Sequence, residues 1–217
     1  MKDEHITQPF GKFFNVLYCV VTVIMKILFP TTVEGLEKLP KESVLLCANH
    51  SSNWDPILVV LALPMNYRLH IMAKEELFHN PILAWLIRKC GGFPVDRGNT
   101  DIKSIKTAMQ TIKSGENLLV FPEGTVIDDG IGRVDGLPAH AKSGVAVIGI
   151  RTGAKLVPVF VGGKKRLFHR TRIVFGGEYT PVYTGRHGTA EEMQKIADDL
   201  LSESYALGGQ AVGGKPL

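Results

Sequence analysis

The chain has 217 residues, of which 45% are hydrophobic and 21% are charged. These proportions are those of an ordinary globular protein, so they exclude a disordered chain, a collagen-like repeat and a polytopic membrane protein. The net charge of +4 is too small for a nucleic-acid coat, although residues 63–186 carry 18 basic against 10 acidic side chains. The three cysteines lie far apart without CxxC spacing, which predicts neither a disulfide framework nor a zinc site and is typical of a reducing compartment.

An apolar helix is predicted over residues 10–30, within an N-terminal segment that we place at residues 1–32. The charges in this stretch are Lys12 and Lys26, and the uncharged run between them has 13 residues, fewer than the ~20 that cross a bilayer. Polar and small side chains recur every three or four residues and form one narrow stripe. We therefore expect a helix in the membrane interface, which makes the protein peripheral or monotopic on the cytoplasmic face of the cell membrane. A core helix covered by the domain is one alternative, and a marginal crossing of the membrane, extended to Phe29 by snorkelling of Lys26, is the other.

The rest of the chain has the pattern of an α/β domain, which we place at residues 33–206. Short apolar runs alternate with segments of helical period, as expected for a mostly parallel central sheet flanked by helices. A helix is predicted over Asp101–Lys113, and a T-x-x-E sequence from Thr189 predicts the capping box of a C-terminal helix. Residues 207–217 are rich in glycine and are expected to form a flexible tail. Strands are predicted at Val44–Ala48, Leu69–Ala73, Phe93–Val95, Asn117–Phe121, Leu156–Val161 and Thr171–Phe175.

The sequence NHSSNWDP, at residues 49–56, follows the first of these strands. Asp55 and Pro56 are typical of the N-cap and the first position of a helix. A regular helix would hold His50 and Asp55 about 140° apart, so only a turn before the helix can bring their side chains together. In the functional interpretation they form a dyad, in which Asp55 orients the imidazole and His50 removes a proton from a hydroxyl. The other interpretation is a helix cap near an ordinary loop histidine, and spacing alone favours it.

Three further segments carry notable residues at the ends of apolar runs. GGFPVDR, at residues 91–97, places Arg97 where its guanidinium can meet a phosphate, unless it only pairs with the neighbouring aspartate. FPEGT, at residues 121–125, turns at proline and glycine, and Glu123 is either a ligand for a substrate hydroxyl or a solvated turn carboxylate. LVPV, at residues 156–159, has a proline within a strand pattern, which predicts an edge strand, a bulge or a wall beside a ligand.

Taken together and in this order, the four segments resemble the lysophospholipid acyltransferase family, in particular the 1-acylglycerol-3-phosphate acyltransferases. NHSSNWD matches the N-H-x-x-x-x-D block of that family, GGFPVDR its second block, FPEGT its third and LVPV its fourth. The similarity covers about residues 33–183, and it favours the dyad over the helix cap. It implies transfer of a fatty acyl group from an acyl thioester, either acyl-CoA or acyl-carrier protein, to the free hydroxyl of lysophosphatidic acid. It implies no metal and no bound cofactor, and the expected partners are the lysophospholipid, the acyl donor and a membrane surface, without nucleic acid.

The resemblance also implies individual catalytic roles. His50 is the general base that activates the acceptor hydroxyl, Asp55 orients it, and Arg97 contacts the acceptor phosphate. The hydroxyl then attacks the thioester carbonyl directly, so no acyl-enzyme forms. Cys47 and Cys90 lie close to the motifs, but their positions in a strand and at a helix end are typical of packing residues.

The third block supplies further candidate substrate-binding residues. Glu123 and Gly124 are expected to line the acceptor site, with Thr125 binding substrate beside them. Lys142, which follows the block, is a candidate phosphate contact. Val126 stands where the family usually has an arginine. Another lysophospholipid or a glycerol-3-phosphate-like acceptor is therefore an alternative.

A basic stretch at residues 162–172 contains five Lys or Arg and no acidic residue. It is either a solvated loop or a surface for anionic head groups or the phosphates of CoA. Two functions of another class also stay open. One is a metal-dependent phosphoesterase with His50, Asp55 and Glu123 as ligands, and the other is a non-catalytic lipid-binding protein.

Overall fold

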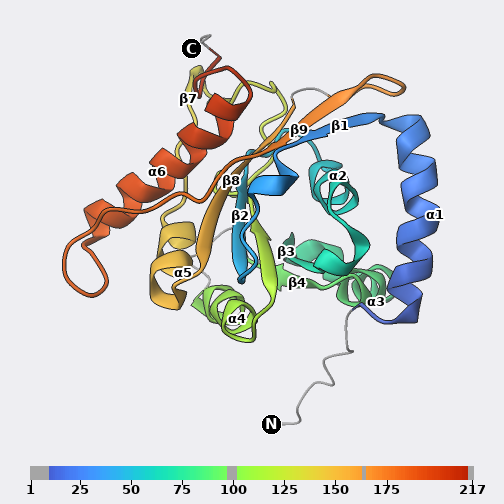
Figure 1. The fold of residues 1–217 in the computed structure, drawn as a ribbon, viewed down its shortest axis with the longest axis horizontal. Coiled ribbons are helices and arrows are strands. Elements are labelled where there is room, and N and C mark those ends of the chain that lie inside the picture. Colours follow the sequence, from blue (N-terminus) through green and yellow to red (C-terminus); the bar gives the residue numbers. More distant parts are fainter. Residues whose placement is uncertain (1–9, 97–101, 163–164, 215–217) are drawn as a thin grey trace.

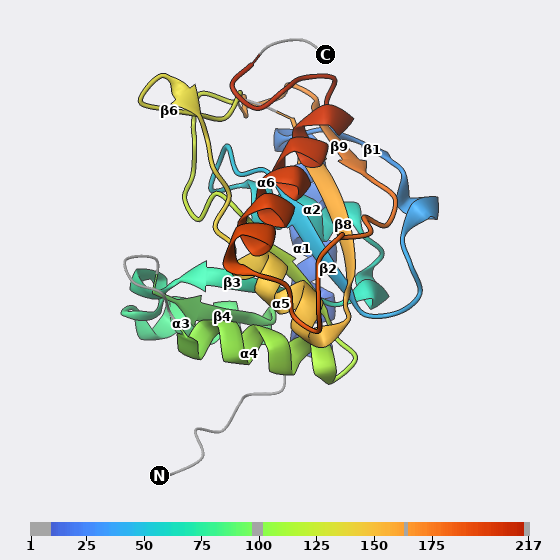
Figure 2. The same ribbon diagram turned by 90° about the vertical axis from the view of Figure 1, so that its left-hand side faces the viewer.

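The computed structural model describes residues 10–96, 102–162 and 165–214, and within these ranges a seven-stranded sheet forms the centre of the molecule. Its strands lie in the order β1-β9-β8-β2-β5-β3-β4, and every neighbouring pair is parallel except β8 with β9. Helices cover both faces of the sheet (Figures 1 and 2). The predicted fold, a mostly parallel sheet flanked by helices, is confirmed.

The elements have the following bounds. The strands of the sheet are β1 Thr31–Glu34, β2 Val44–Ala48, β3 Leu69–Lys74, β4 Gly92–Val95, β5 Asn117–Val120, β8 Lys155–Val161 and β9 Thr171–Phe175. A separate hairpin pairs β6 Arg133–Val134 with β7 Leu137–Pro138. The helices are α1 Lys12–Leu28, α2 Asp55–Ala62, α3 Pro81–Lys89, α4 Ile102–Lys113, α5 Gly144–Thr152 and α6 Ala190–Leu207.

The strands predicted from apolar runs coincide with β2, β3, β4, β5, β8 and β9 to within one residue at each end. The capping box of α6 is also confirmed, because the Thr189 hydroxyl accepts a hydrogen bond from the Glu192 N–H and the Glu192 carboxylate accepts one from the Thr189 N–H. β1 was not predicted. It is a four-residue edge strand in which no residue is fully buried, so its sequence TTVE carries little hydrophobic signal.

β2 is buried on both faces, which explains why its sequence VLLCA is apolar throughout. Val44 and Leu46 point to a core that includes residues of α1 and α2. Leu45 and Cys47 point to a second core that includes residues of α4, α5 and α6. Figure 2 shows these three helices in front of the sheet and α1 and α2 behind it. The carboxyl end of β2, where the first motif begins, is therefore held between two packed layers.

Pro158 lies in the interior of the sheet, because β8 is hydrogen-bonded between β2 and β9. The edge-strand interpretation of this proline is therefore wrong. The bulge interpretation is supported, since Val159 pairs with Phe175 whereas Leu156 pairs with Tyr179. Between these two pairs the chain advances three positions along β8 but four positions on the segment from Phe175 to Tyr179. One extra residue on one side defines a β-bulge.

α1 packs on the domain along one side and leaves its other side exposed. Phe14 and Met25 are buried, and the Tyr18 hydroxyl donates a hydrogen bond of 2.7 Å to the Leu63 carbonyl just after α2. Within the described residues, no helix is both long and apolar enough to cross a membrane. A fully covered core helix is not what the structure shows, because six large apolar side chains of α1 are 40–65% exposed: Phe13, Val16, Val20, Val23, Ile24 and Ile27.

Both ends of the described chain are joined to the domain. At the N-terminal end, the Phe10 N–H donates a hydrogen bond of 3.1 Å to the Lys89 carbonyl at the end of α3. At the other end, residues 208–214 lie against the segment before β6. The Gly213 N–H donates to the Ile131 carbonyl over 2.8 Å, and the Gly213 carbonyl accepts from Arg133 Nε over 2.7 Å. This part of the glycine-rich tail therefore has a defined position.

Candidate active site

The candidate residues gather at the carboxyl edge of the sheet. β2 and β5 are parallel neighbours, so the segments that follow them, residues 49–56 and 121–125, lie side by side. Asn49 also joins the first segment to β8, since its side chain exchanges two hydrogen bonds with the backbone of Val161, over 3.0 and 2.7 Å. The next residue, His50, is thereby fixed relative to the three central strands.

His50 and Asp55 form a dyad in the turn between β2 and α2. The imidazole Nδ1 lies 3.1 Å from Asp55 Oδ2, and His50 and Asp55 are only 3% and 0% exposed. The same carboxylate oxygen accepts hydrogen bonds from the N–H groups of Ser51 and Ser52, over 2.7 and 2.8 Å. The expectation that Asp55 is the N-cap of α2 is wrong. Asp55 is already the first helical residue, and its carboxylate turns back to the donors of the preceding turn.

Lys165 is a third member of this cluster that the sequence did not indicate. Its ammonium lies 2.7 Å from Asp55 Oδ1, and the side chain is 2% exposed. Burial lowers the pKa of Lys165, and the nearby Asp55 carboxylate opposes that change. Neither interpretation of the basic stretch, as a solvated loop or as a surface for anions, holds for this lysine. A lysine among other basic residues has no periodic or apolar pattern that would predict burial.

Glu123 supports the dyad from the other side of the turn. Its Oε2 accepts a hydrogen bond from the His50 N–H, and its Oε1 accepts one of 2.7 Å from the Tyr205 hydroxyl. Burial raises the pKa of Glu123 to about 7. Glu123 is 6% exposed, so its interpretation as a solvated carboxylate is wrong, while its role as a substrate ligand stays a prediction. Tyr205 comes from α6, and no motif pointed to it.

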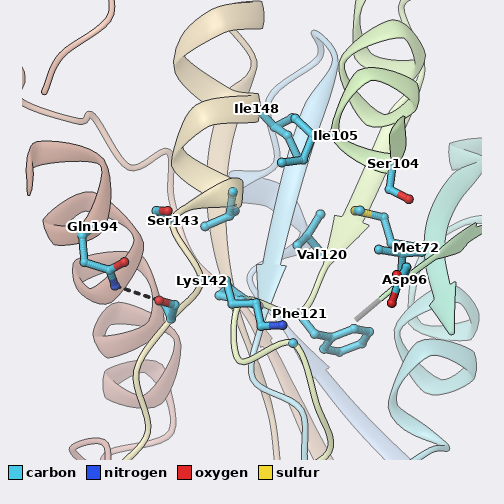
Figure 3. Close-up of a pocket in the computed structure, with 16 residues that line it drawn as sticks. Met72, Asp96, Ser104, Ile105, Val120, Phe121, Lys142, Ser143, Ile148 and Gln194 are labelled. Atoms are coloured by element: carbon cyan, nitrogen blue, oxygen red, sulfur yellow. Dashed lines mark hydrogen bonds between the residues drawn. The ribbon is translucent and has the colours of Figure 1, made fainter. Parts of the chain in front are cut away.

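A cavity of about 510 Å³ lies beside the dyad, between the sheet and helices α4, α5 and α6 (Figure 3). Phe121 lies between the dyad and the cavity. Its ring stacks on the His50 imidazole with centroids 4.0 Å apart and also lines the cavity. Figure 3 shows the apolar side chains of Ile105 and Ile148 at one end, and Lys142 with Phe121 at the other. The cavity therefore has an apolar end and, close to the imidazole, an end that carries Lys142, while the Asp96 carboxylate also lines it.

The other candidate substrate residues have different positions. Gly124 and Lys142 both line the cavity, and Gly124 has a φ of +72°, with space so tight that a Cβ would lie 2.5 Å from Lys142 Cε. Glycine at this position thus lets the lysine side chain cross the turn. Thr125 is exposed and is not part of the cavity lining. Arg97 lies outside the described residues.

Cys47 and Cys90 have the environment of packing residues, whereas Cys19 is exposed on α1. Cys47 is completely buried, and burial raises the pKa of its thiol. Burial also raises the pKa of the Cys90 thiol. A raised pKa keeps each sulfur as a thiol rather than a nucleophilic thiolate. Within the part of the chain that the structure describes, no three His, Cys, Asp or Glu side chains are grouped to hold a metal ion.

The family model and the curated relatives that match this chain point to the same family. The model of the acyltransferase family matches residues 30–162, which is more than half of the chain. The 1-acyl-sn-glycerol-3-phosphate acyltransferase of Bacillus subtilis is 31% identical over 154 residues, covering 70% of this chain and 73% of that protein. The protein of the same name from Streptococcus pneumoniae is 33% identical over 143 residues, covering 63% of this chain. The match spans only 50% of the pneumococcal protein's length.

A solved structure supports the fold. The crystal structure of the 1-acyl-sn-glycerophosphate (LPA) acyltransferase from Thermotoga maritima matches with a TM-score of 0.65. The match covers 91% of this chain and 78% of that one, at 23% sequence identity. At this identity the likeness concerns the arrangement of the sheet and helices.

Proposed function

The chain belongs to the acyltransferase family, and from this premise we propose that it transfers a fatty acyl group from an acyl thioester to the free hydroxyl of lysophosphatidic acid, giving phosphatidic acid. The observation that carries the proposal is the buried His50–Asp55 dyad, with Nδ1 and Oδ2 3.1 Å apart, beside a cavity that is apolar at one end and carries Lys142 at the other. The names of the relatives from Bacillus and Streptococcus support the same acceptor.

In the proposed mechanism His50 acts as the general base. Asp55 accepts the hydrogen bond from Nδ1–H, so the lone pair of Nε2 is available for the proton of the acceptor hydroxyl. The hydroxyl oxygen attacks the thioester carbonyl as its proton moves to Nε2. The tetrahedral intermediate then collapses with cleavage of the C–S bond, and the imidazolium gives its proton to the leaving thiolate. The products are the ester and a free thiol, and no group on the enzyme is acylated.

We assign the acceptor phosphate to the end of the cavity where the Lys142 side chain crosses Gly124. Lys142→Met should raise the KM for lysophosphatidic acid about 10- to 100-fold, because a charge-assisted hydrogen bond to phosphate is lost. The KM for palmitoyl-CoA should change less than threefold. Free thiol release and phosphatidic acid formation measure the reaction in the purified protein, and Lys195→Met, an exposed lysine on α6, is the control.

The same assay tests the proposed function against its alternatives. Thiol release by wild type should depend on the acceptor and should persist when a chelator is added. Thiol release that is no faster with lysophosphatidic acid than without it would remove the proposed function. A faster reaction with another lysophospholipid or with glycerol 3-phosphate would identify a different acceptor for the same chemistry. Comparing the rates with palmitoyl-CoA and with the palmitoylated acyl-carrier protein identifies the acyl donor.

We also propose that the protein works on the cytoplasmic face of the membrane, attached through α1. The exposed apolar side chains Val16, Val20, Val23 and Ile27 recur at helical spacing along one side of α1. The ring of Phe13 lies 4.9 Å from that of Trp85, so the apolar surface continues onto α3. A helix with such a side suits the interface of a bilayer rather than water.

The membrane proposal predicts a loss of vesicle binding when charge is placed on this side of α1. Val20→Glu with Ile27→Glu should lower the partitioning onto anionic phospholipid vesicles at least tenfold, because two apolar side chains are lost and two charges face the lipid. Vesicle flotation measures the bound fraction. Val182→Glu is the control, since Val182 is 87% exposed on the segment between β9 and α6. Equal binding of the α1 variant and wild type would contradict attachment through this helix.

A further inference from the structure

The two oxygens of the Asp55 carboxylate have different partners, hydrogen-bond donors on Oδ2 and an ion pair on Oδ1. Oδ2 accepts from the imidazole of His50 and from backbone N–H groups of the turn, whereas Oδ1 lies 2.7 Å from the Lys165 ammonium. If Oδ2 alone had partners, the carboxylate could turn about that oxygen, and the direction in which Oδ2 faces the imidazole would change. We infer that Lys165 is a positioning residue, which fixes Asp55 so that Oδ2 stays in line with His50 Nδ1. This inference rests on the proposed function, because it gives Asp55 the role of orienting a general base.

The surroundings of Lys165 match this role and not that of an anion ligand. An ammonium has three hydrogens to donate. Nζ lies within hydrogen-bond distance of Asp55 Oδ1 at 2.7 Å, Ser51 Oγ at 2.8 Å and the Gly162 carbonyl at 2.5 Å. With 2% of its side chain exposed, Lys165 would have to give up one of these contacts to bind a phosphate.

The segment that carries Lys165 is fixed at both ends. Before the lysine, just after β8, the Gly162 N–H donates a hydrogen bond of 2.7 Å to the Arg172 carbonyl. Three residues after the lysine, the Phe168 N–H donates a hydrogen bond of 2.7 Å to the Leu28 carbonyl at the end of α1. Figure 1 shows this segment beside that end of α1. Backbone hydrogen bonds on both sides of Lys165 thus hold its ammonium next to the dyad.

The charges around the imidazole predict how the pH profile of the reaction should depend on Lys165. Asp55 and Lys165 together are neutral, so the site gains a positive charge when His50 accepts a proton. Without Lys165, the Asp55 carboxylate would be unbalanced and would favour the protonated imidazole more strongly. Among the described residues, the other titratable groups near the turn include Glu123, which accepts from the His50 N–H, Tyr205, which donates to Glu123, and Asp129, whose charge acts on both. They are the same in every variant compared below.

Lys165→Met should lower kcat about 10- to 100-fold through misplacement of the dyad, with each KM within threefold of wild type. The acid limb of the pH profile of kcat/KM should move to higher pH, and Lys165→Arg should keep the limb in place because it keeps the charge. A lysine that only stabilised the fold would not move the limb. Lys195→Met is the matched control, since Lys195 also pairs with an aspartate, Asp199, but at the surface.

Two further measurements keep the test decisive. The first is the double variant Asp55→Asn with Lys165→Met, which leaves no unpaired buried charge. If Lys165 acts through Asp55, this double variant should have the same kcat as Asp55→Asn alone. The downfield imidazole N–H proton resonance, assigned by its loss in His50→Gln, should shift or broaden in Lys165→Met and stay unchanged in Lys195→Met. This resonance does not depend on turnover, so it tests Lys165 even if the proposed reaction fails.

The inference would be overturned by any of three results. The first is a rise in the KM for the thioester or the acceptor with kcat unchanged, which would make Lys165 a substrate ligand. The second is an equal loss of kcat when Lys165→Met is added to wild type and to Asp55→Asn. The third is an imidazole resonance that is identical in Lys165→Met and wild type. Absence of acceptor-dependent thiol release by wild type would instead count against the proposed function.

Discussion

His50→Gln should lower kcat/KM for acyl transfer by about 10²- to 10⁴-fold, the range that general base catalysis contributes. Glutamine approximates the volume of the imidazole beside Phe121, so the buried turn should stay packed, but its amide nitrogen cannot take a proton from a hydroxyl. The His50 backbone N–H, which binds Glu123, is kept. Initial rates of thiol release from palmitoyl-CoA with lysophosphatidic acid measure the effect, and circular dichroism establishes that the variant is folded.

The matched control is His70→Gln. His70 is also largely buried, and its Nδ1 lies 3.0 Å from the Gly91 carbonyl, but it belongs to β3 and not to the catalytic turn. Its substitution should leave kcat/KM within about threefold of wild type. Equal rates for His50→Gln and wild type would remove the catalytic assignment. Loss of turnover in a folded Cys47→Ala variant would instead favour an acyl-enzyme and refute direct transfer.

The C-terminal helix contributes to the site although the motifs all precede it. Tyr205 binds Glu123, which in turn binds the His50 backbone. One residue earlier, the Ser204 hydroxyl donates a hydrogen bond of 2.8 Å to the carbonyl of Cys47 in β2. α6 therefore holds both the end of β2 and the turn that follows it. Truncation within α6 would expose the buried Glu123 carboxyl as well as the core.

Much of this arrangement could be predicted from the sequence because it depends on local pattern. Apolar runs predicted the strands, whereas spacing alone left the contact of His50 with Asp55 open and only the resemblance to the family favoured it. Lys165 and Tyr205 could not be found in that way. Each reaches the site from a segment more than 80 residues away from its carboxylate in the sequence, and the packing of the sheet brings them there. The role of Asp55 was also misjudged in part, since spacing cannot show whether a carboxylate caps its own helix or turns back.

Glu123 predicts a pH dependence of stability. In the folded protein burial raises its pKa from 4.5 to about 7, whereas in the unfolded chain the carboxyl ionises near its ordinary value. A group whose pKa is raised by folding contributes stability that is fully present below the unfolded pKa and is lost as the pH rises through the folded pKa. The free energy of unfolding should therefore lose a contribution of about 3 kcal/mol as the pH rises from 4.5 through 7.

Glu123→Gln isolates this contribution. The glutamine oxygen can accept from the His50 N–H, and its amide can donate to the Tyr205 oxygen, so both contacts of the neutral carboxyl are replaced. The stability of wild type relative to Glu123→Gln should fall by roughly 2–3 kcal/mol between pH 5 and pH 8, as measured by urea unfolding. The control Glu178→Gln, at an exposed glutamate, should show no comparable fall. A difference between wild type and Glu123→Gln that stays constant or grows with pH would mean that this carboxyl is ionised throughout, and that the turn beneath His50 is held by a charge rather than by a neutral acid.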